Sequence, residues 1–242
     1  MIAKHIKSFF ERRGFVLGGD LNRNDRAGAL HRAWGHVFTN HIRGDYVEFG
    51  VYQGGSFVES YKQYQIFERW LQAQLTSSEE WRRSVAKSYC DHKTHFHGLD
   101  TFGGMPENAE DNLTFAKGTY IASRSLVTEK CLRAGMRSSS CSLYQGMFSE
   151  TTTSLAQNLS PKVAIVNIDC DIYGSAVDAL AAIRDKLQLG CVLMFDGYNA
   201  YCADNRRGER RAFHEFCSSV PFKFEPWFAY QYSGQAFLCV ED

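Results

Sequence analysis

The sequence lacks an excess of charge of either sign, has few prolines and contains no long apolar run. Its 27 lysines and arginines balance 27 aspartates and glutamates, which excludes a global basic field for nucleic acid or an anionic membrane. No apolar run approaches the length of a transmembrane helix. The first fifteen residues carry a charge every few positions, so we expect no secretory signal. With four prolines and 44% apolar residues, the chain is neither collagen-like nor disordered.

The chain also lacks the spacings that make cysteine a metal ligand or a disulfide framework. It has eight cysteines, but no two form a CxxC pair and none pairs with histidine at zinc-finger spacing. Cys170, Cys191 and Cys239 lie inside apolar runs, where a free thiol behaves as a small hydrophobic side chain. We therefore predict eight reduced thiols and a cytoplasmic protein.

Short apolar runs alternate with helical patterns along the chain. The segments 162–172 and 191–195 are almost continuously apolar and rich in β-branched residues, which is typical of strands buried on both faces. Further strands are predicted over 45–51, 94–99, 142–148, 222–226 and 235–240. This alternation predicts an α/β fold with a mostly parallel seven-stranded sheet and helices on both faces. Such sheets bind ligands at the carboxyl ends of their strands.

Helical patterns fill the intervals between these strands. Ser175 and Asp178 predict the start of a helix after 162–172, and Gly190 predicts its end. The long interval 56–93 predicts two helices where one would suffice. The first 44 residues look helical and lie outside the predicted sheet. We therefore expect an N-terminal helical cap over 1–44 and a ligand-binding domain over 45–242.

A glycine-rich turn follows the first predicted strand, in the segment EFGVYQGGS over 48–56. Such a turn lets a ligand approach the backbone closely. It is not the dinucleotide fingerprint, because Tyr52 stands where the second glycine is required. Glu48 would repel a phosphate and suits a ligand with an amino group. The alternative is a plain tight turn between a strand and a helix.

The same segment resembles motif I of the S-adenosylmethionine-dependent methyltransferases, in the branch of the macrocin, mycinamicin and novobiocin O-methyltransferases. The likeness runs from about residue 43 to 213, through HGLDTFGGMP (97–106), FAKGTY (115–120) with Ser123, LYQGMFSE (143–150), NIDCDIYGS (167–175), FDGY (195–198) and GERRAF (208–213). It implies a class I methyltransferase-like (Rossmann-like) fold, S-adenosylmethionine as methyl donor, and a small-molecule hydroxyl, on a sugar or secondary metabolite, as acceptor. It also favours a homo-oligomer, with neither nucleic acid nor membrane as a partner.

The resemblance assigns the cofactor to residues that follow the first three strands or lie close to them: Glu48, Gly50, Gly54, Ser56, Asp100, Thr101, Ser123, Gln145, Gly146 and Phe148. It implies that the glycine turn encloses the methionine end, with Glu48 near its ammonium group. A carboxylate at Asp100 can accept hydrogen bonds from both ribose hydroxyls. Phe148 would form a wall of the adenine site. The alternatives are that Asp100 caps a loop and that Phe148 is a core residue.

Three aspartates carry the predicted chemistry. In a strand, residues i and i+2 share a face, so Asp169 and Asp171 are expected to point the same way. Asp196 ends the next strand, about 4.8 Å away. Like charges this close are costly without a cation or a proton. Asp169 and Asp196 are predicted to hold Mg²⁺, which would acidify the acceptor hydroxyl, and Asp171 to act as general base. The alternative is that Asp171 caps a helix or is solvated.

One position departs from the resembling enzymes. They carry an Asp-Asp pair where this sequence has Asp196 followed by Gly197, so one metal-binding carboxylate is missing. A site without metal is therefore an open alternative. A cofactor-binding scaffold without catalysis is another, as is a nicotinamide-dependent oxidoreductase, although Tyr52 and Glu48 disfavour the last.

Overall fold

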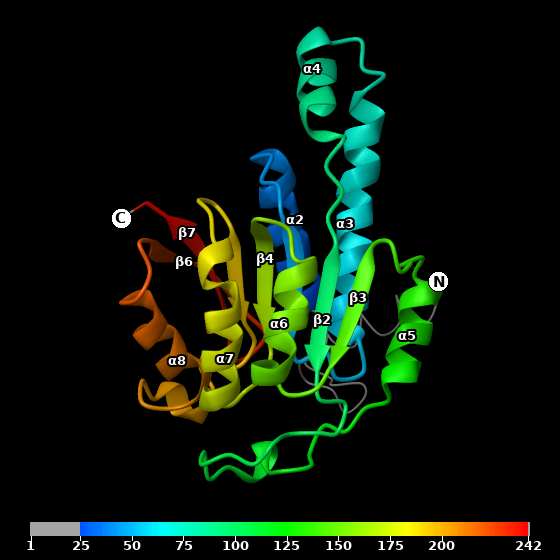
Figure 1. The fold of residues 1–242 in the computed structure, drawn as a ribbon. Helices are drawn as coiled ribbons and strands as arrows, with labels where there is room; N and C mark the ends of the chain where they lie inside the picture. The colour runs from blue at the N-terminus through cyan, green and yellow to red at the C-terminus, as the bar shows by residue number, and fades with distance from the viewer. Residues whose placement is uncertain (1–24, 242) are drawn as a thin grey trace, which may run out of the picture.

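A computed structural model of the chain describes residues 25–241 and shows one seven-stranded sheet (Figure 1). The strand order is β3-β2-β1-β4-β5-β7-β6, with parallel neighbours except at β7, which is antiparallel to β5 and β6. The predicted mostly parallel, seven-stranded sheet is confirmed. The strands are β1 (Asp45–Phe49), β2 (Phe96–Asp100), β3 (Cys141–Gln145), β4 (Val163–Ile168), β5 (Val192–Phe195), β6 (Lys223–Tyr230) and β7 (Gly234–Val240).

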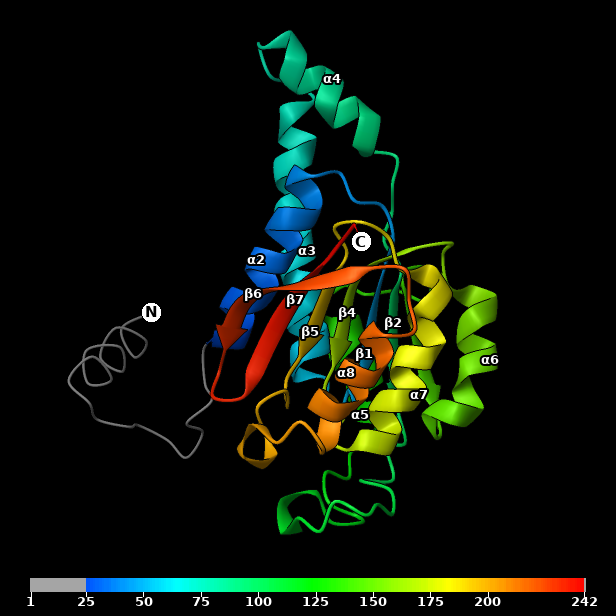
Figure 2. The ribbon, with the colours of Figure 1, turned by 90° about the vertical axis from the view of Figure 1, so that its left-hand side faces the viewer.

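Helices cover both faces of the sheet (Figures 1 and 2). One apolar layer joins the sheet to α2, α3 and α5, and the other joins it to α6, α7 and α8. Among residues 25–241, no helix is long and apolar enough to cross a membrane. The α-helices are α2 (Asp25–Thr39), α3 (Gly55–Gln74), α4 (Glu80–Tyr89), α5 (Arg124–Arg133), α6 (Phe148–Asn158), α7 (Tyr173–Ile183) and α8 (Gly208–Cys217).

The predicted N-terminal cap falls only partly within the described residues. Residues 1–24 lie outside them, and α2 occupies 25–39. Helix α2 packs on α3, β4 and β6, and the Trp34 indole nitrogen donates to Ser60 Oγ of α3 at 3.0 Å. This part of the cap is therefore one of the helices that cover the sheet. The boundary at residue 44 stays a prediction.

The two predicted helices between the first two strands are present as α3 and α4. The predicted start of α7 at Ser175 and Asp178 is wrong, because the helix already begins at Tyr173 with Ile172 at the N-cap. The backbone N–H of Tyr173 donates to the Glu110 carboxylate at 2.8 Å, so a residue from a distant loop satisfies this helix end. Ser175 and Asp178 lie inside the helix instead.

The carboxyl ends of the parallel strands meet at one edge of the sheet. A long connection, 101–122, runs along this edge, whereas α4 and the end of α3 project from the opposite end of the molecule (Figure 1). A ligand at the strand ends therefore meets this connection, and α4 lies far from it.

A buried carboxylate fixes the opposite edge of the sheet. Asp45 begins β1 and is 1% exposed. It accepts hydrogen bonds from His97 Nε2 at 3.1 Å and from the backbone N–H groups of His95 at 3.0 Å and Ser160 at 2.7 Å. Burial raises the pKa of Asp45, but these hydrogen bonds outweigh it, so the pKa lies below its usual value. Asp45 thus ties the start of β2 and the segment before β4 to β1.

We predict that Asp45→Ala lowers the free energy of unfolding at pH 7 by about 2–4 kcal/mol, because the buried His97 ring and two half-buried N–H groups lose their acceptor. Urea denaturation measures this, with the exposed Asp185→Ala as control. A lowered folded pKa gives a stabilisation that is complete above the unfolded pKa of about 3.9 and is lost as the pH falls through the folded value. The two variants should therefore converge in stability in acid. Equal stabilities of both variants at pH 7 would contradict this role.

Candidate functional site

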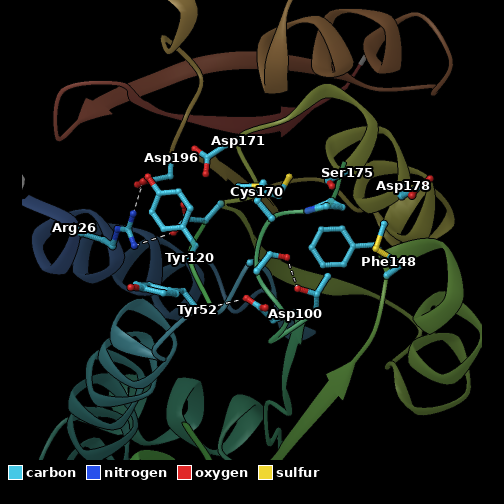
Figure 3. Close-up of a pocket in the computed structure, with 17 residues that line it drawn as sticks. Arg26, Tyr52, Asp100, Tyr120, Phe148, Cys170, Asp171, Ser175, Asp178 and Asp196 are labelled. Atoms are coloured by element: carbon cyan, nitrogen blue, oxygen red, sulfur yellow. Dashed lines mark hydrogen bonds and ion pairs between the residues drawn. The ribbon is translucent and has the colours of Figure 1, made fainter. Parts of the chain in front are cut away.

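A cavity of about 290 Å³ lies at the carboxyl ends of the strands (Figure 3). It opens beside β1 and β4, where the strand order reverses, which is the usual ligand position in open α/β sheets. Most of its walls come from the segments that directly follow strands. The cavity is lined by Arg26, Gly50, Tyr52, Asp100, Thr101, Gly104, Met105, Pro106, Tyr120, Met147, Phe148, Asp169, Cys170, Asp171, Ser175, Asp178 and Asp196.

The sequence-predicted residues divide into two groups. The structure brings one group together around the cavity: Gly50, Asp100, Thr101, Phe148, Asp169, Asp171 and Asp196. A second group does not line it: Glu48, Gly54, Ser56, Ser123, Gln145 and Gly146.

Glu48 lies beneath the glycine turn and has no exposed surface. Its carboxylate accepts hydrogen bonds from Ser56 Oγ at 2.6 Å and from the Tyr46 hydroxyl. Burial raises the pKa of Glu48, and these donors oppose the rise. The pair of Glu48 and Ser56 therefore joins β1 to the first turn of α3, and neither side chain reaches the cavity.

The remaining residues of this second group shape the backbone. Gly54 is the N-cap of α3 with φ +77°, and a Cβ there would lie 3.0 Å from Val127 of α5. Ser123 caps α5 by accepting from the Leu126 N–H at 3.4 Å. Gln145 ends β3, and the N–H of Gly146 donates to the Asp100 carbonyl at 3.1 Å. These residues set the positions of helices and strand ends around the cavity.

Gly50 lets the ends of β1 and β4 approach each other. It has φ +94°, and a Cβ at this position would lie 1.8 Å from the Asp169 carbonyl oxygen. No side chain fits there, so the backbone of the turn itself forms part of the cavity wall.

Asp100 stands at the end of β2 and holds two loops. Its Oδ2 accepts from the Tyr52 N–H at 2.7 Å and its Oδ1 from the Phe102 N–H at 2.6 Å. Burial raises the pKa of Asp100, and the two backbone hydrogen bonds oppose the rise. Each carboxylate oxygen keeps a further lone pair for a ligand. Asp100 therefore caps the loops and also faces the cavity.

An apolar wall stands across from Asp100. Met147 and Phe148 follow β3 and line the cavity. Phe148 is 8% exposed and packs edge-on against Phe49, with ring centroids 5.2 Å apart. Phe148 thus belongs both to the core and to the cavity wall, and its place beside an adenine stays a prediction.

Asp169 and Asp171 both line the cavity, but not for the reason that the sequence suggested. Strand β4 ends at Ile168, so Asp169 and Asp171 lie after the strand, and the rule that residues i and i+2 of a strand share a face does not apply to them. Asp171 instead has φ +62°, a left-handed conformation that is rare for a residue other than glycine. The N–H groups of Cys170 and Asp171 both donate to Glu209 Oε1 at 3.0 Å, which holds this turn.

Glu209 of α8 was not predicted from the sequence. It is fully buried, and its Oε2 also accepts the N–H of Gly197 at 2.9 Å. Burial raises the pKa of Glu209 to about 8. The only sequence signal was its place in the GERRAF segment. The residue fixes the ends of β4 and β5 together.

Burial also raises the pKa of Asp171, to about 7, with Asp196 raising it further and Arg26 opposing the rise. A carboxyl group with such a pKa gains and loses its proton near neutral pH. Because Asp171 lines the cavity, it can exchange a proton with a bound ligand.

Arg26, which the sequence reading missed, bridges the other two aspartates (Figure 3). Its Nη1 lies 2.9 Å from Asp169 Oδ2, and its Nη2 contacts Asp196 Oδ2. With the Gln231 amide oriented to satisfy both neighbours, its nitrogen donates to Asp196 Oδ1 at 3.0 Å and its oxygen accepts from Arg26 Nε at 2.8 Å. Burial lowers the pKa of Arg26, but Asp169 and Asp196 outweigh it and raise the pKa.

This geometry does not match the predicted Mg²⁺ site. Arg26 already engages Asp169 and Asp196, and residue 197 supplies no ligand side chain. A Cβ on Gly197 would lie 3.3 Å from both Asp171 Oδ1 and Glu209 Oε2. Within residues 25–241, no three His, Cys, Asp or Glu side chains form a group that could hold a metal ion. The described residues therefore do not fit the predicted ion.

The connection 101–122 forms the roof of the cavity. Its Tyr120 ring meets the Tyr52 ring edge-on, with centroids 5.6 Å apart, and both line the cavity. The Glu110 carboxylate anchors the connection by accepting the N–H groups of Tyr173 at 2.8 Å and Gly208 at 3.2 Å. Glu110 thereby ties the connection to the first turns of α7 and α8.

Known proteins resemble the chain in sequence and in fold. A relative from Streptomyces olivaceus, 8-demethyl-8-(2,3-dimethoxy-alpha-L-rhamnosyl)-tetracenomycin-C 4'-O-methyltransferase, is 24% identical over 170 residues, or 67% of this chain. The chain spans 56% of that relative's length.

Two solved structures resemble the chain in fold. The O-methyltransferase NovP matches with a TM-score of 0.64 and 17% identity, over 89% of this chain and 80% of its own. TomG from Streptomyces achromogenes, an O-methyltransferase involved in tomaymycin synthesis and solved in complex with SAM, matches with a TM-score of 0.54 and 9% identity, over 98% of this chain and 96% of its own.

The family model of the macrocin O-methyltransferases (TylF) matches residues 20–218, which is most of the chain. The resemblance seen in the sequence motifs is thereby confirmed, and the chain belongs to the macrocin O-methyltransferase (TylF) family.

Proposed function

We propose that the protein transfers a methyl group from S-adenosylmethionine to a hydroxyl of a small molecule, on a sugar of a secondary metabolite. The observation that carries the proposal is that Asp100 and Asp171 line one cavity at the carboxyl edge of the sheet. One carboxylate suits a ribose and the other a proton transfer. Family membership and the sugar named for the Streptomyces olivaceus relative support the proposal.

The cofactor would lie along the ends of β1, β2 and β3. The free lone pairs of Asp100 would accept the ribose hydroxyls, and Met147 with Phe148 would cover the adenine. Gly50 would let the methionine part lie against the backbone. When bound, S-adenosylmethionine supplies an electrophilic methyl group. A TomG structure solved in complex with SAM supports this donor.

Asp171 would take the proton of the acceptor hydroxyl. Its left-handed turn, held by Glu209, aims the carboxylate from the end of β4, and a pKa of about 7 suits a base at neutral pH. The nearby Asp169 would act through its ion pair with Arg26. The described residues offer no metal site, so no step is assigned to a metal. Positioning of the two reactants would supply much of the acceleration.

The acceptor would enter beside Tyr52 and Tyr120. Their perpendicular rings form an aromatic surface on which the apolar face of a sugar ring can pack. The roof formed by 101–122 would limit the access of water during transfer. A cytoplasmic location suits the eight free cysteines, and a homo-oligomer stays a prediction.

Binding of S-adenosylhomocysteine tests the cofactor site. We predict micromolar affinity by calorimetry and an about ten- to a hundredfold loss in Asp100→Ala, because charged hydrogen bonds to the ribose disappear. The exposed Asp185→Ala should bind as the wild type does. Circular dichroism must show that Asp100→Ala is folded, since Asp100 also caps two loops. Binding of NADH in place of S-adenosylhomocysteine would refute the proposal.

Methyl transfer tests Asp171. In Asp171→Asn, transfer of labelled methyl from S-adenosylmethionine into a metabolite extract should fall by about 10²–10⁴-fold, with S-adenosylhomocysteine affinity unchanged. A base acts when ionised, so the wild-type rate should rise as the pH increases through about 7. The Asp171→Asn variant should lose this rise of the rate with pH. An unchanged rate in Asp171→Asn would exclude it as the base.

A further inference from the structure

The pair of Asp169 and Asp196 encloses a cation that belongs to the chain itself. We propose that the Arg26 guanidinium is the permanent cation of this site and takes the place of a divalent metal ion. The chain would then carry out its reaction without a metal. The part of this inference that concerns catalysis rests on the proposed function; the part that concerns metal binding does not.

The guanidinium is held as a fork between the two strand ends. Its Nη1 pairs with Asp169 after β4 and its Nη2 with Asp196 after β5, while its Nε donates to the Gln231 amide oxygen. These contacts use three of the five N–H groups of an arginine. The Arg26 side chain is 27% exposed and lines the cavity. Its two other N–H groups are therefore available to an oxygen of the acceptor.

The packing of α2 explains why this arginine reaches the site. Leu30, Ala33 and Val37 are buried and repeat at helical spacing. Arg26 lies on the same face, one turn before Leu30. The carboxylates of Asp169 and Asp196 then hold the guanidinium at the strand ends.

The charges around the cavity require such a cation. Three aspartates, Asp169, Asp171 and Asp196, follow β4 and β5 and line the cavity together. Among the described residues of its wall, Arg26 is the only lysine or arginine. Without it, the like charges would repel one another across the strand ends. Arg26 therefore offsets one of the two negative charges of the pair and leaves the Asp171 carboxylate outside the ion pair.

Gly197 and Glu209 are consistent with an arginine rather than a metal. The Glu209 carboxylate lies close by, but its Oε1 accepts the N–H groups of Cys170 and Asp171, its Oε2 accepts that of Gly197, and Glu209 does not line the cavity. At residue 197, glycine replaces the second aspartate of the motif. A divalent ion held by three carboxylates leaves one net negative charge, and one guanidinium held by two carboxylates leaves the same. Arg26 and Gly197 together therefore match the charge balance of such a metal site.

Metal binding separates the two possibilities without any acceptor. Binding of Mn²⁺ to the full chain can be followed by electron paramagnetic resonance in wild type, Arg26→Ala and Arg26→Lys. The surface variant Arg133→Ala is the control, because Arg133 is exposed and pairs with the exposed Glu129 one turn away. We expect wild type and Arg133→Ala to bind no Mn²⁺ at millimolar concentration. Arg26→Ala should gain binding at the vacated pair, and this gain should disappear in Arg26→Ala combined with Asp196→Ala.

The catalytic part is tested by chelation. Methyl transfer by the wild type should be unchanged after EDTA treatment and fall at least a hundredfold in Arg26→Ala, with partial rescue by added guanidinium. The methyl-transfer rate of Arg26→Lys should lie between the rates of the wild type and Arg26→Ala, because the point charge of a lysine cannot bridge both carboxylates as a planar guanidinium does. Arg26→Lys also keeps the test valid should the alanine variant fail to fold.

Two results would overturn the inference. One is stoichiometric Mn²⁺ binding to the wild type that is lost in Asp196→Ala. The other is a failure of Arg26→Ala, when it is folded, to gain Mn²⁺ binding. If no variant, nor the wild type, transfers methyl while the Mn²⁺ results are as expected, the proposed function fails and the assignment of Arg26 as the cation of the site stands.

Discussion

The geometry of the site depends on one buried carboxylate that never faces the ligand. Glu209 reaches from α8 under the ends of β4 and β5 and accepts three backbone N–H groups. These contacts hold Asp171 in its left-handed turn and set the distance between the two strand ends. Asp169 and Asp196 come to face each other across a gap that a guanidinium spans. Loss of Glu209 would leave all three N–H groups without an acceptor and release the three aspartates together.

The sheet could be predicted from the sequence because β4 and β5 are apolar on both faces and parallel strands need that pattern. The same logic located Asp100 and Asp196, since Asp100 ends β2, Asp196 directly follows β5, and strand ends meet at one edge. Glu48 shows the limit of this reasoning. Its residue type suggested a ligand contact, but whether an acid beside a glycine turn faces the cavity or the core depends on packing by Tyr46 and Ser56.

Arg26 was beyond prediction for a different reason. It lies far before the first strand, and only the docking of α2 on the sheet brings it to the strand ends. The same holds for Tyr120, which reaches the cavity through a connection without regular structure around it. Asp171 was located correctly by an argument about strand faces that does not apply to its turn. Contacts between elements far apart in sequence carry the information that motifs lack.

The pairing of a glycine at 197 with an arginine at 26 has an evolutionary consequence. On the inference that Arg26 is the cation of the site, the two positions lie on different elements but set the charge at the same strand ends. An aspartate at 197 beside Arg26 would add a carboxylate that the guanidinium does not offset. A change between a site built on an ion and a site built on a side chain would therefore require changes at both positions.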